Sequence, residues 1–221
     1  MRKWIYILCL PLFLMACNQQ AVEQISEGYL RVGKIEIMAD QEVTPLQTRG
    51  VHESLQVDIY QGAIRVYSYA PGELVSDAPI ALPVGQYTLV AHSVDMTEPG
   101  DGSCGVPLYS VSRDFEIQVD QTTTIDGLIA LRVNAGVSVT YQDELFEQTM
   151  SEIQCVVQSP SGRTVTISGT KDNSIYYFSL PENGKLTYYI KCKNIDSEDF
   201  QTEPKEMVVD QPKNYVIKVT L

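Results

Sequence analysis

The feature that most constrains the fold is an alternation of apolar and polar residues that recurs along most of the chain. In residues 29–38, Leu30, Val32, Ile35 and Ile37 are apolar, and charged side chains stand between them. Side chains on a β-strand alternate between its two faces, so this period of two indicates a strand with one buried face. Similar runs follow at 55–60, 63–69, 78–85, 86–93, 113–119, 128–141, 152–158, 163–168, 175–180, 185–193, 205–209 and 215–221.

These predicted strands are separated by turn residues, among the 14 glycines and 11 prolines of the chain. Short strands at regular spacing with turns between them are typical of antiparallel β-sandwiches. We therefore predict an all-β protein of two tandem antiparallel β-sandwich domains, immunoglobulin- or transthyretin-like, at 28–127 and 128–221. One extended sandwich is the alternative. A helical pattern occurs only at residues 143–150, where apolar side chains share one face.

The N-terminus has the pattern of a targeting segment. Arg2 and Lys3 precede an apolar run over residues 4–16, which is too short to cross a hydrocarbon core of about 30 Å. Such a run is typical of a secretory signal peptide. It ends in Leu-Met-Ala-Cys17, which resembles the lipobox of bacterial lipoproteins. That resemblance implies that residues 1–16 are removed, that Cys17 is acylated and anchors the chain in a membrane, and that residues 17–27 form a tether.

Charge and histidine content exclude several classes of function. With 28 acidic and 16 basic side chains, the formal net charge is −12, which argues against a nucleic-acid partner. The two histidines, His52 and His92, have no nucleophile motif beside them, so we predict that the protein is not an enzyme. The acidic loop at 95–104 offers carboxylates to Ca²⁺ but lacks the spacing of an EF-hand. We therefore expect no metal and no cofactor.

Three cysteines stay free to react in the mature chain. Cys104, Cys155 and Cys192 follow the signal peptide and the lipidation site. Because Cys155 and Cys192 both lie in predicted strands, they are the candidate disulfide pair. Two buried free thiols are the alternative.

Two tyrosine doublets are candidates for ligand contact. In Tyr176-Tyr177 and Tyr188-Tyr189, adjacent strand positions face opposite sides, so one ring of each doublet lies outward or in an interface. Outward rings can stack on sugars or anchor a protein partner. The alternative is packing between strands, which tyrosine also favours.

The segment LPVGQYTLVA at 82–91 carries a family resemblance. It stands in order with Gly-Tyr-Leu at 28–30, Val-Asp-Ile-Tyr at 57–60, Pro-Leu-Tyr at 107–109, Phe-Glu-Ile at 115–117 and the run at 131–141. This order resembles a family of uncharacterised Bacteroidetes lipoproteins built on a domain of unknown function and related in architecture to fimbrillin-like pilins and adhesins. The resemblance implies an extracytoplasmic β-sandwich without known enzymatic activity. Within the segment itself, Tyr87, Leu89 and Ala91 share a predicted core face, and Tyr87 suits a tyrosine corner.

Arg49 is a candidate processing site. It lies in an unpatterned stretch after the first predicted strand. In fimbrillin-like pilins, cleavage after such an arginine removes the first strand and opens a groove for a neighbour's strand. The resemblance then implies displacement of residues 29–38, with 215–221 as a donor strand. An ordinary exposed arginine is the alternative.

Together these patterns predict a non-enzymatic, lipid-anchored cell-envelope protein of the outer membrane, a fimbrillin-like adhesion or assembly accessory. The alternative is a glycan-binding accessory lipoprotein for polysaccharide uptake. Its partners are then the membrane, through the lipid, and either proteins joined by strand addition or glycans. In lipoproteins that this N-terminus resembles, export to the surface goes with acidic residues just after the lipidated cysteine. Here the first acidic residue after Cys17 is Glu23, so the resemblance favours the periplasmic face over the cell surface without deciding between them.

Overall fold

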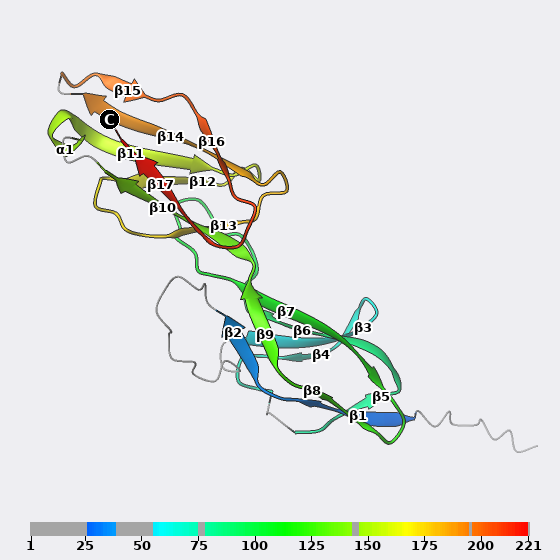
Figure 1. The fold of residues 1–221 in the computed structure, drawn as a ribbon. Coiled ribbons are helices and arrows are strands. Elements are labelled where there is room, and N and C mark those ends of the chain that lie inside the picture. Colours follow the sequence, from blue (N-terminus) through cyan, green and yellow to red (C-terminus); the bar gives the residue numbers. More distant parts are fainter. Residues whose placement is uncertain (1–25, 39–54, 75–77, 143–145, 195, 221) are drawn as a thin grey trace, which may run out of the picture.

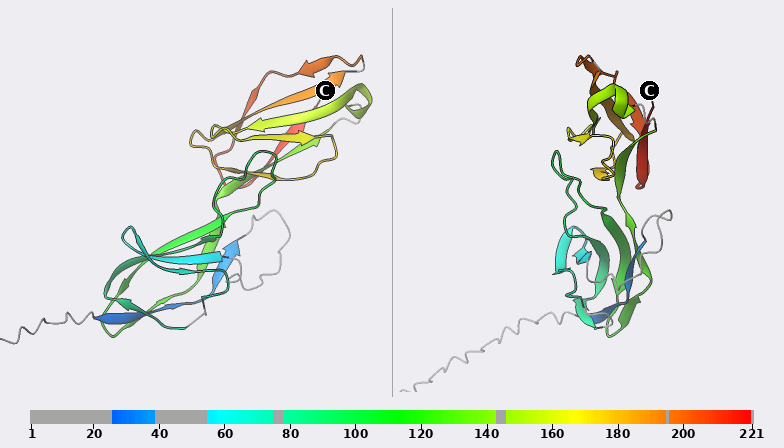
Figure 2. Two further views of the ribbon diagram at one scale, coloured as in Figure 1. Left: turned by 180° about the vertical axis from the view of Figure 1, so that it is seen from behind. Right: turned by 90° about the vertical axis from the view of Figure 1, so that its left-hand side faces the viewer.

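The computed structural model describes residues 26–38, 55–74, 78–142, 146–194 and 196–220 (Figure 1). Cys17, Arg49 and His52 lie outside these residues, so the predictions of lipidation and processing are not addressed by the fold. The described chain is almost entirely β-structure, in sheets that pack as sandwiches, which confirms the predicted all-β class. The two further views in Figure 2 show its two halves arranged end to end.

The N-terminal half contains two sheets. Its three-stranded sheet has the order β5-β1-β8, and its six-stranded sheet has the order β2-β9-β7-β6-β3-β4. The strands are β1 (Glu27–Val32), β2 (Ile35–Met38), β3 (Leu55–Gln61), β4 (Ile64–Tyr69), β5 (Ile80–Pro83), β6 (Gly85–Ser93), β7 (Tyr109–Ile117), β8 (Thr122–Ile125) and β9 (Leu128–Arg132).

The C-terminal half repeats this two-sheet arrangement. One sheet has the order β13-β10-β17, and the other has the order β12-β11-β14-β15, with β16 also paired to β14. Its elements are β10 (Asn134–Tyr141), α1 (Phe146–Thr149), β11 (Met150–Gln158), β12 (Thr164–Ser168), β13 (Tyr176–Ser179), β14 (Lys185–Asn194), β15 (Asp199–Gln201), β16 (Lys205–Val208) and β17 (Asn214–Val219). The single turn α1 lies within the predicted helical stretch. No helix in the described ranges has the length and apolarity to span a membrane.

The buried apolar side chains form two separate clusters, one in each half. The alternation seen in the sequence explains how they form: Val57 and Ile59 on β3 are buried in the first cluster, whereas Asp58 between them faces the other side of the sheet. The chain passes from one cluster to the other at Val133, between β9 and β10. The division into domains at 28–127 and 128–221 stays a prediction.

Three strand pairs are parallel, a direction that the alternation does not encode. They are β1 with β8, β2 with β9, and β10 with β17. The first two arise because β1 and β2 form one nearly continuous segment that passes from the first sheet to the second. Gly33 stands between them, where an added Cβ would lie 2.0 Å from Oδ1 of Asp126, so a larger residue would require the Asp126 side chain to move. The remaining pairings are antiparallel, as predicted.

The segment at 82–91 folds as its residues predict. Tyr87, Leu89 and Ala91 are buried in the first cluster. The Tyr87 hydroxyl donates a hydrogen bond of 2.8 Å to the carbonyl of Pro83, which ties the start of β6 to the end of β5. This hydrogen bond is the tyrosine corner expected from the sequence.

Candidate functional site

The connection between β6 and β7, residues 94–108, leaves the six-stranded sheet and contacts the C-terminal half. The carbonyl of Cys104 accepts a hydrogen bond of 2.8 Å from the backbone N–H of Tyr177 on β13. Oδ1 of Asp101 accepts one of 2.8 Å from the N–H of Thr164 on β12. A backbone N–H of β12 and one of β13 therefore find acceptors in the other half, at strand edges that would otherwise be exposed.

Arg163 holds this connection from the C-terminal side. Only 5% of the residue is exposed, and its guanidinium donates to the carbonyls of Ser103 and Tyr177. The guanidinium also lies 4.5 Å from the ring centroid of Phe178, a cation–π distance. Burial lowers the pKa of Arg163, while the nearby carboxylates, those of Glu98 and Asp101, oppose that shift. The arginine therefore links two backbone segments from different halves.

Two further buried polar residues, Arg132 and Asn134, lie where the chain passes from one half to the other. Nη1 of Arg132 donates to Oδ1 of Asn214 at 2.9 Å, and its guanidinium lies 5.1 Å from the Tyr177 ring centroid. The Asn134 amide accepts from the N–H of Leu108 and donates to the carbonyl of Val106, both at 2.9 Å. Each side chain therefore connects β9 or β10 to a segment distant in sequence. We refer to the contacts of residues 94–108, Arg132, Asn134 and Arg163 as the junction.

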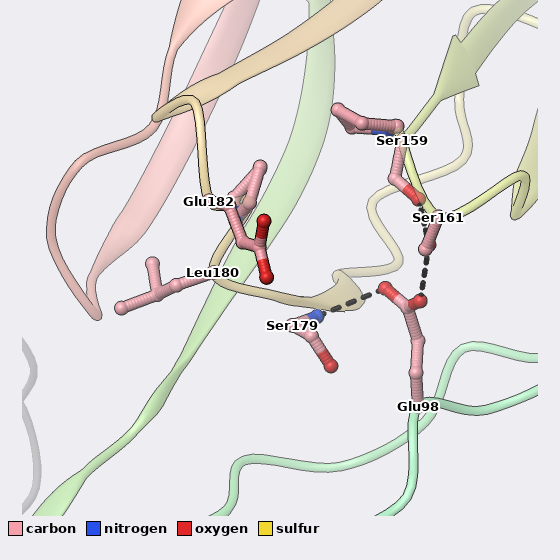
Figure 3. A pocket seen from close by; sticks show the side chains of 8 residues that line it. Glu98, Ser159, Ser161, Ser179, Leu180 and Glu182 are labelled. Atoms are coloured by element: carbon pink, nitrogen blue, oxygen red, sulfur yellow. Dashed lines mark hydrogen bonds between the residues drawn. The ribbon is translucent and has the colours of Figure 1, made fainter.

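A cleft of about 310 Å³ opens beside the junction (Figure 3). Three segments meet there: the β6–β7 connection, the turn between β11 and β12, and the end of β13 with the turn that follows it. The lining residues are Glu98, Ser159, Pro160, Ser161, Ser179, Leu180, Pro181 and Glu182.

The side chain of Glu98 is fixed in the cleft by two hydrogen bonds. Its Oε2 accepts a hydrogen bond of 2.6 Å from Oγ of Ser161, and its Oε1 accepts one of 3.0 Å from the N–H of Ser179. Ser161 is also in hydrogen-bond contact with Ser159, so both hydroxyls line up towards the carboxylate. No histidine, cysteine, lysine or arginine lines this cleft.

A buried carboxylate lies on the outer face of the six-stranded sheet. Asp58 is 2% exposed. Its oxygens contact Ser68 at 2.7 Å, Gln56 at 3.1 Å, and Tyr60, Arg65 and His92 at 3.3 Å each. Burial by itself raises the pKa of Asp58, but the hydrogen bonds from Ser68, Gln56, His92 and Arg65 outweigh it and lower the pKa to about 2.

His92 is a structural member of this network. Its Nδ1 lies 2.7 Å from the carbonyl of Ser93, and its Nε2 faces Asp58. With both ring nitrogens engaged inside the sheet, this histidine has neither nitrogen free to serve a nucleophile.

The four candidate tyrosines do not form one platform. Tyr176 and Tyr188 belong to, or pack against, the second cluster. Tyr177 faces the other way but lies under Arg132 in the junction, and Tyr189 faces outward with the Lys191 ammonium 5.4 Å from its ring centroid. The opposite orientation within each doublet follows the alternation, as predicted.

The described cysteines are free thiols, in place of the predicted disulfide. Cys155 and Cys192 are both buried in the second cluster, on the paired strands β11 and β14, and Cys104 is exposed. Burial raises the pKa of Cys155 to about 12 and also raises that of Cys192. The two buried thiols pack as small apolar side chains, which is the alternative that the sequence left open.

The junction residues were not identified from the sequence. Arg132, Asn134 and Gly136 stand close together in a strand run, and each meets a partner far along the chain. An added Cβ at Gly136 would lie 2.3 Å from Oδ1 of Asn214, so the glycine makes room for that contact. Polar residues and a glycine inside an otherwise apolar strand were the available signal.

A family model described as Domain of unknown function (DUF4493) matches residues 26–221. None of the curated proteins matches the chain. Among solved structures, a proposed adhesin from Bacteroides ovatus is similar at 11% identity, with 93% of this chain and 97% of that chain covered and a TM-score of 0.45. Proposed polysaccharide-binding proteins from Bacteroides thetaiotaomicron are similar at 14% identity, with coverage of 87% and 91% and a TM-score of 0.47. A fimbrilin from Porphyromonas gingivalis has 12% identity, coverage of 78% and 73%, and a TM-score of 0.39.

Proposed function

The chain belongs to the DUF4493 family, and from that premise we propose that it is a non-enzymatic, lipid-anchored protein of the cell envelope that serves adhesion or assembly. The observation that carries the proposal is the placement of the chain's two described ends. β1 begins at one end of the molecule, and β17 ends near the other (Figure 1). A lipid on Cys17 would therefore hold the N-terminal half near the membrane and present the C-terminal half to partners.

The junction supports this role, because a protein that holds a partner away from a membrane must transmit force between its halves. Asp101 and Cys104 connect the β6–β7 segment to two strands of the C-terminal half, and Arg163 adds contacts to two carbonyls. These contacts, together with those of Arg132 and Asn134, resist bending at Val133.

Strand addition is the proposed mode of protein partnership. Among the described strands, β17 pairs only with β10, so its second edge is open to a further strand. β1 lies between β5 and β8, and it buries Leu30 and Val32 at 0% and 1% exposure. Cleavage after Arg49 and displacement of residues 29–38 would take these two side chains out of the core and expose the apolar residues that they cover, so another strand would have to replace β1.

The glycan-binding alternative has less support in the geometry. A sugar platform needs several outward rings on one face, and only Tyr189 of the four candidate tyrosines faces outward without serving the junction or the core. We therefore place adhesion or assembly first.

Protease shaving of intact cells, followed by an immunoblot, tests the proposal. Loss of the band would support a surface adhesion role, and survival until the outer membrane is broken would support assembly in the periplasm. The Cys17→Ala variant should leave the membrane fraction in either case. A wild-type chain recovered without lipid in the soluble fraction would refute the anchored role.

Intact-mass measurement of the envelope-purified protein tests the processing step. A chain that begins at Gly50 would support cleavage after Arg49, and the Arg49→Ala variant should then stay uncut. A single species from Cys17 to Leu221 would contradict processing while leaving the anchored role intact.

A further inference from the structure

Several hydrogen-bond donors that could line the cleft beside the junction are absent or already engaged, whereas its carboxylates keep capacity to accept. Pro160 and Pro181 have no backbone N–H. The N–H of Ser179 is already donated to Glu98, and so is the hydroxyl hydrogen of Ser161. A carboxylate has about four acceptor sites, so Glu98 keeps capacity for a ligand after these two bonds.

The cleft also carries a net negative charge. In the part of the chain that the structure describes, Glu182 has neither an ion-pair nor a hydrogen-bond partner, and its carboxylate stands across the cleft from that of Glu98 (Figure 3). Arg163 interacts with the charge of Glu98, but a single guanidinium cannot balance both carboxylates of the cleft, so the net charge there stays negative. An anionic ligand would be repelled here, and a ligand that only donates would be matched.

Apolar surface makes up the rest of the lining. Pro160, Leu180 and Pro181 present hydrocarbon beside the two carboxylates. A ligand that suits the cleft therefore combines an aliphatic stem with a cationic head. A metal ion fits less well, because among the described residues no group of three or more His, Cys, Asp or Glu side chains could hold one.

We propose that this cleft binds a primary alkylammonium group, the side chain of a lysine on a protein partner. The ammonium has three donors and no acceptor, and it meets Glu98 and Glu182. The four-carbon stem packs on Pro160, Leu180 and Pro181, as lysine stems do on apolar surface. This inference rests on the proposed function in that the partner is a protein of the cell envelope.

Chemical-shift titration of the purified full chain tests the site. The probe is Nα-acetyl-lysine methylamide, and the controls are its norleucine and Nε-acetyl-lysine counterparts, which keep the stem but lose the charge. We expect the lysine probe alone to shift the amides of Ser161, Ser179 and Glu182. Loss of a charge-assisted hydrogen bond in the Glu182→Gln variant should weaken the binding about tenfold.

The matched control is Glu203→Gln, which removes one negative charge from an exposed position outside the cleft and should leave the affinity unchanged. The proposal is overturned if the cleft amides do not shift, if norleucine shifts them equally, or if both variants weaken binding alike. Stronger binding of glucosamine or of Ca²⁺ would overturn it in favour of an amino sugar or a metal. A negative result in this titration would not change the outcome of the protease shaving of intact cells, so the lysine site and the proposed function are tested independently.

Discussion

Replacement of Asn134 by alanine is the most direct perturbation of the junction. The residue is 3% exposed, and its amide holds the backbone of the β6–β7 connection at two points, Val106 and Leu108. Alanine removes both hydrogen bonds without adding volume or charge. We expect the variant to fold with lower stability and with a looser connection between the halves.

The magnitude follows from the surroundings of the two backbone groups. Leu108 is 7% exposed, so its N–H has no access to water in the variant, and an unsatisfied buried donor costs about 1–3 kcal/mol. Val106 is 62% exposed, so water can replace the amide at its carbonyl, and the loss there is about 0.5–1 kcal/mol. The expected decrease in the free energy of unfolding is therefore about 1.5–4 kcal/mol.

Urea denaturation of the wild type and the variant measures this decrease as a shift in midpoint at constant slope. Asn183→Ala is the matched control. Asn183 is exposed, and its Oδ1 accepts from the N–H of Lys185 at 3.0 Å in a turn, where water can take its place. We expect about 0.5 kcal/mol or less for the control. If Asn134→Ala costs no more than Asn183→Ala, the junction does not depend on this amide and the reasoning is wrong.

Three further predictions concern other parts of the molecule. The pKa of Asp58 is about 2 in the fold, below its usual 3.8, so its ionised carboxylate stabilises the fold above pH 4 and this stabilisation is lost as the pH falls towards 2. Acid titration followed by circular dichroism should show the loss, on the order of 2 kcal/mol. The Asp58→Asn variant should lack it. Tyr87→Phe removes the hydrogen bond to the end of β5 and should lower the free energy of unfolding by about 1 kcal/mol in urea, and an unchanged value would contradict the corner. In a chain of residues 18–221, an aromatic disulfide reagent should titrate one native thiol, Cys104, and three after unfolding, whereas only one in both states would indicate that Cys155 and Cys192 are bonded.

The strands were predictable because their signal is local. Leu30 and Val32, or Leu89 and Ala91, lie two positions apart, and their burial follows from the period of the strand alone. The pairing of β1 with β8 or of β10 with β17 is not local. It depends on which distant strand completes each sheet, and the same alternation suits a parallel or an antiparallel neighbour.

The junction escaped prediction for the same reason. From the sequence, the acidic side chains of the loop at 95–104 could be exposed to solvent or could bind Ca²⁺. In the structure, Glu98 and Asp101 instead accept hydrogen bonds from Ser161 and Thr164, each 63 positions further along the chain. The sequence around an acidic residue in a loop is the same whether water, a cation or a backbone N–H interacts with its carboxylate. Only the fold of the C-terminal half decides among these.

The tyrosine doublets show what alternation along a strand can and cannot predict. Their alternation correctly predicts that Tyr176 and Tyr177 face opposite ways, but it leaves open what covers the outward ring. Arg132 covers Tyr177, and Arg132 itself comes from the other half. The face on which a side chain lies follows from its own strand, whereas the residues that contact it come from the other half of the molecule.

Glu98 belongs to both the junction and the cleft, and this double membership determines how the two can be separated. Its carboxylate accepts hydrogen bonds from Ser161 and Ser179 across the junction, so Glu98→Gln would weaken the contact between the halves as well as the cleft. Glu182 lines the cleft without holding any described segment in place. A variant at Glu182 therefore reports on ligand binding alone, and a variant at Asn134 reports on the junction alone. If a lysine probe bound at the cleft raised the unfolding midpoint of Asn134→Ala by as much as it raised that of the wild type, the cleft would bind its ligand independently of that amide.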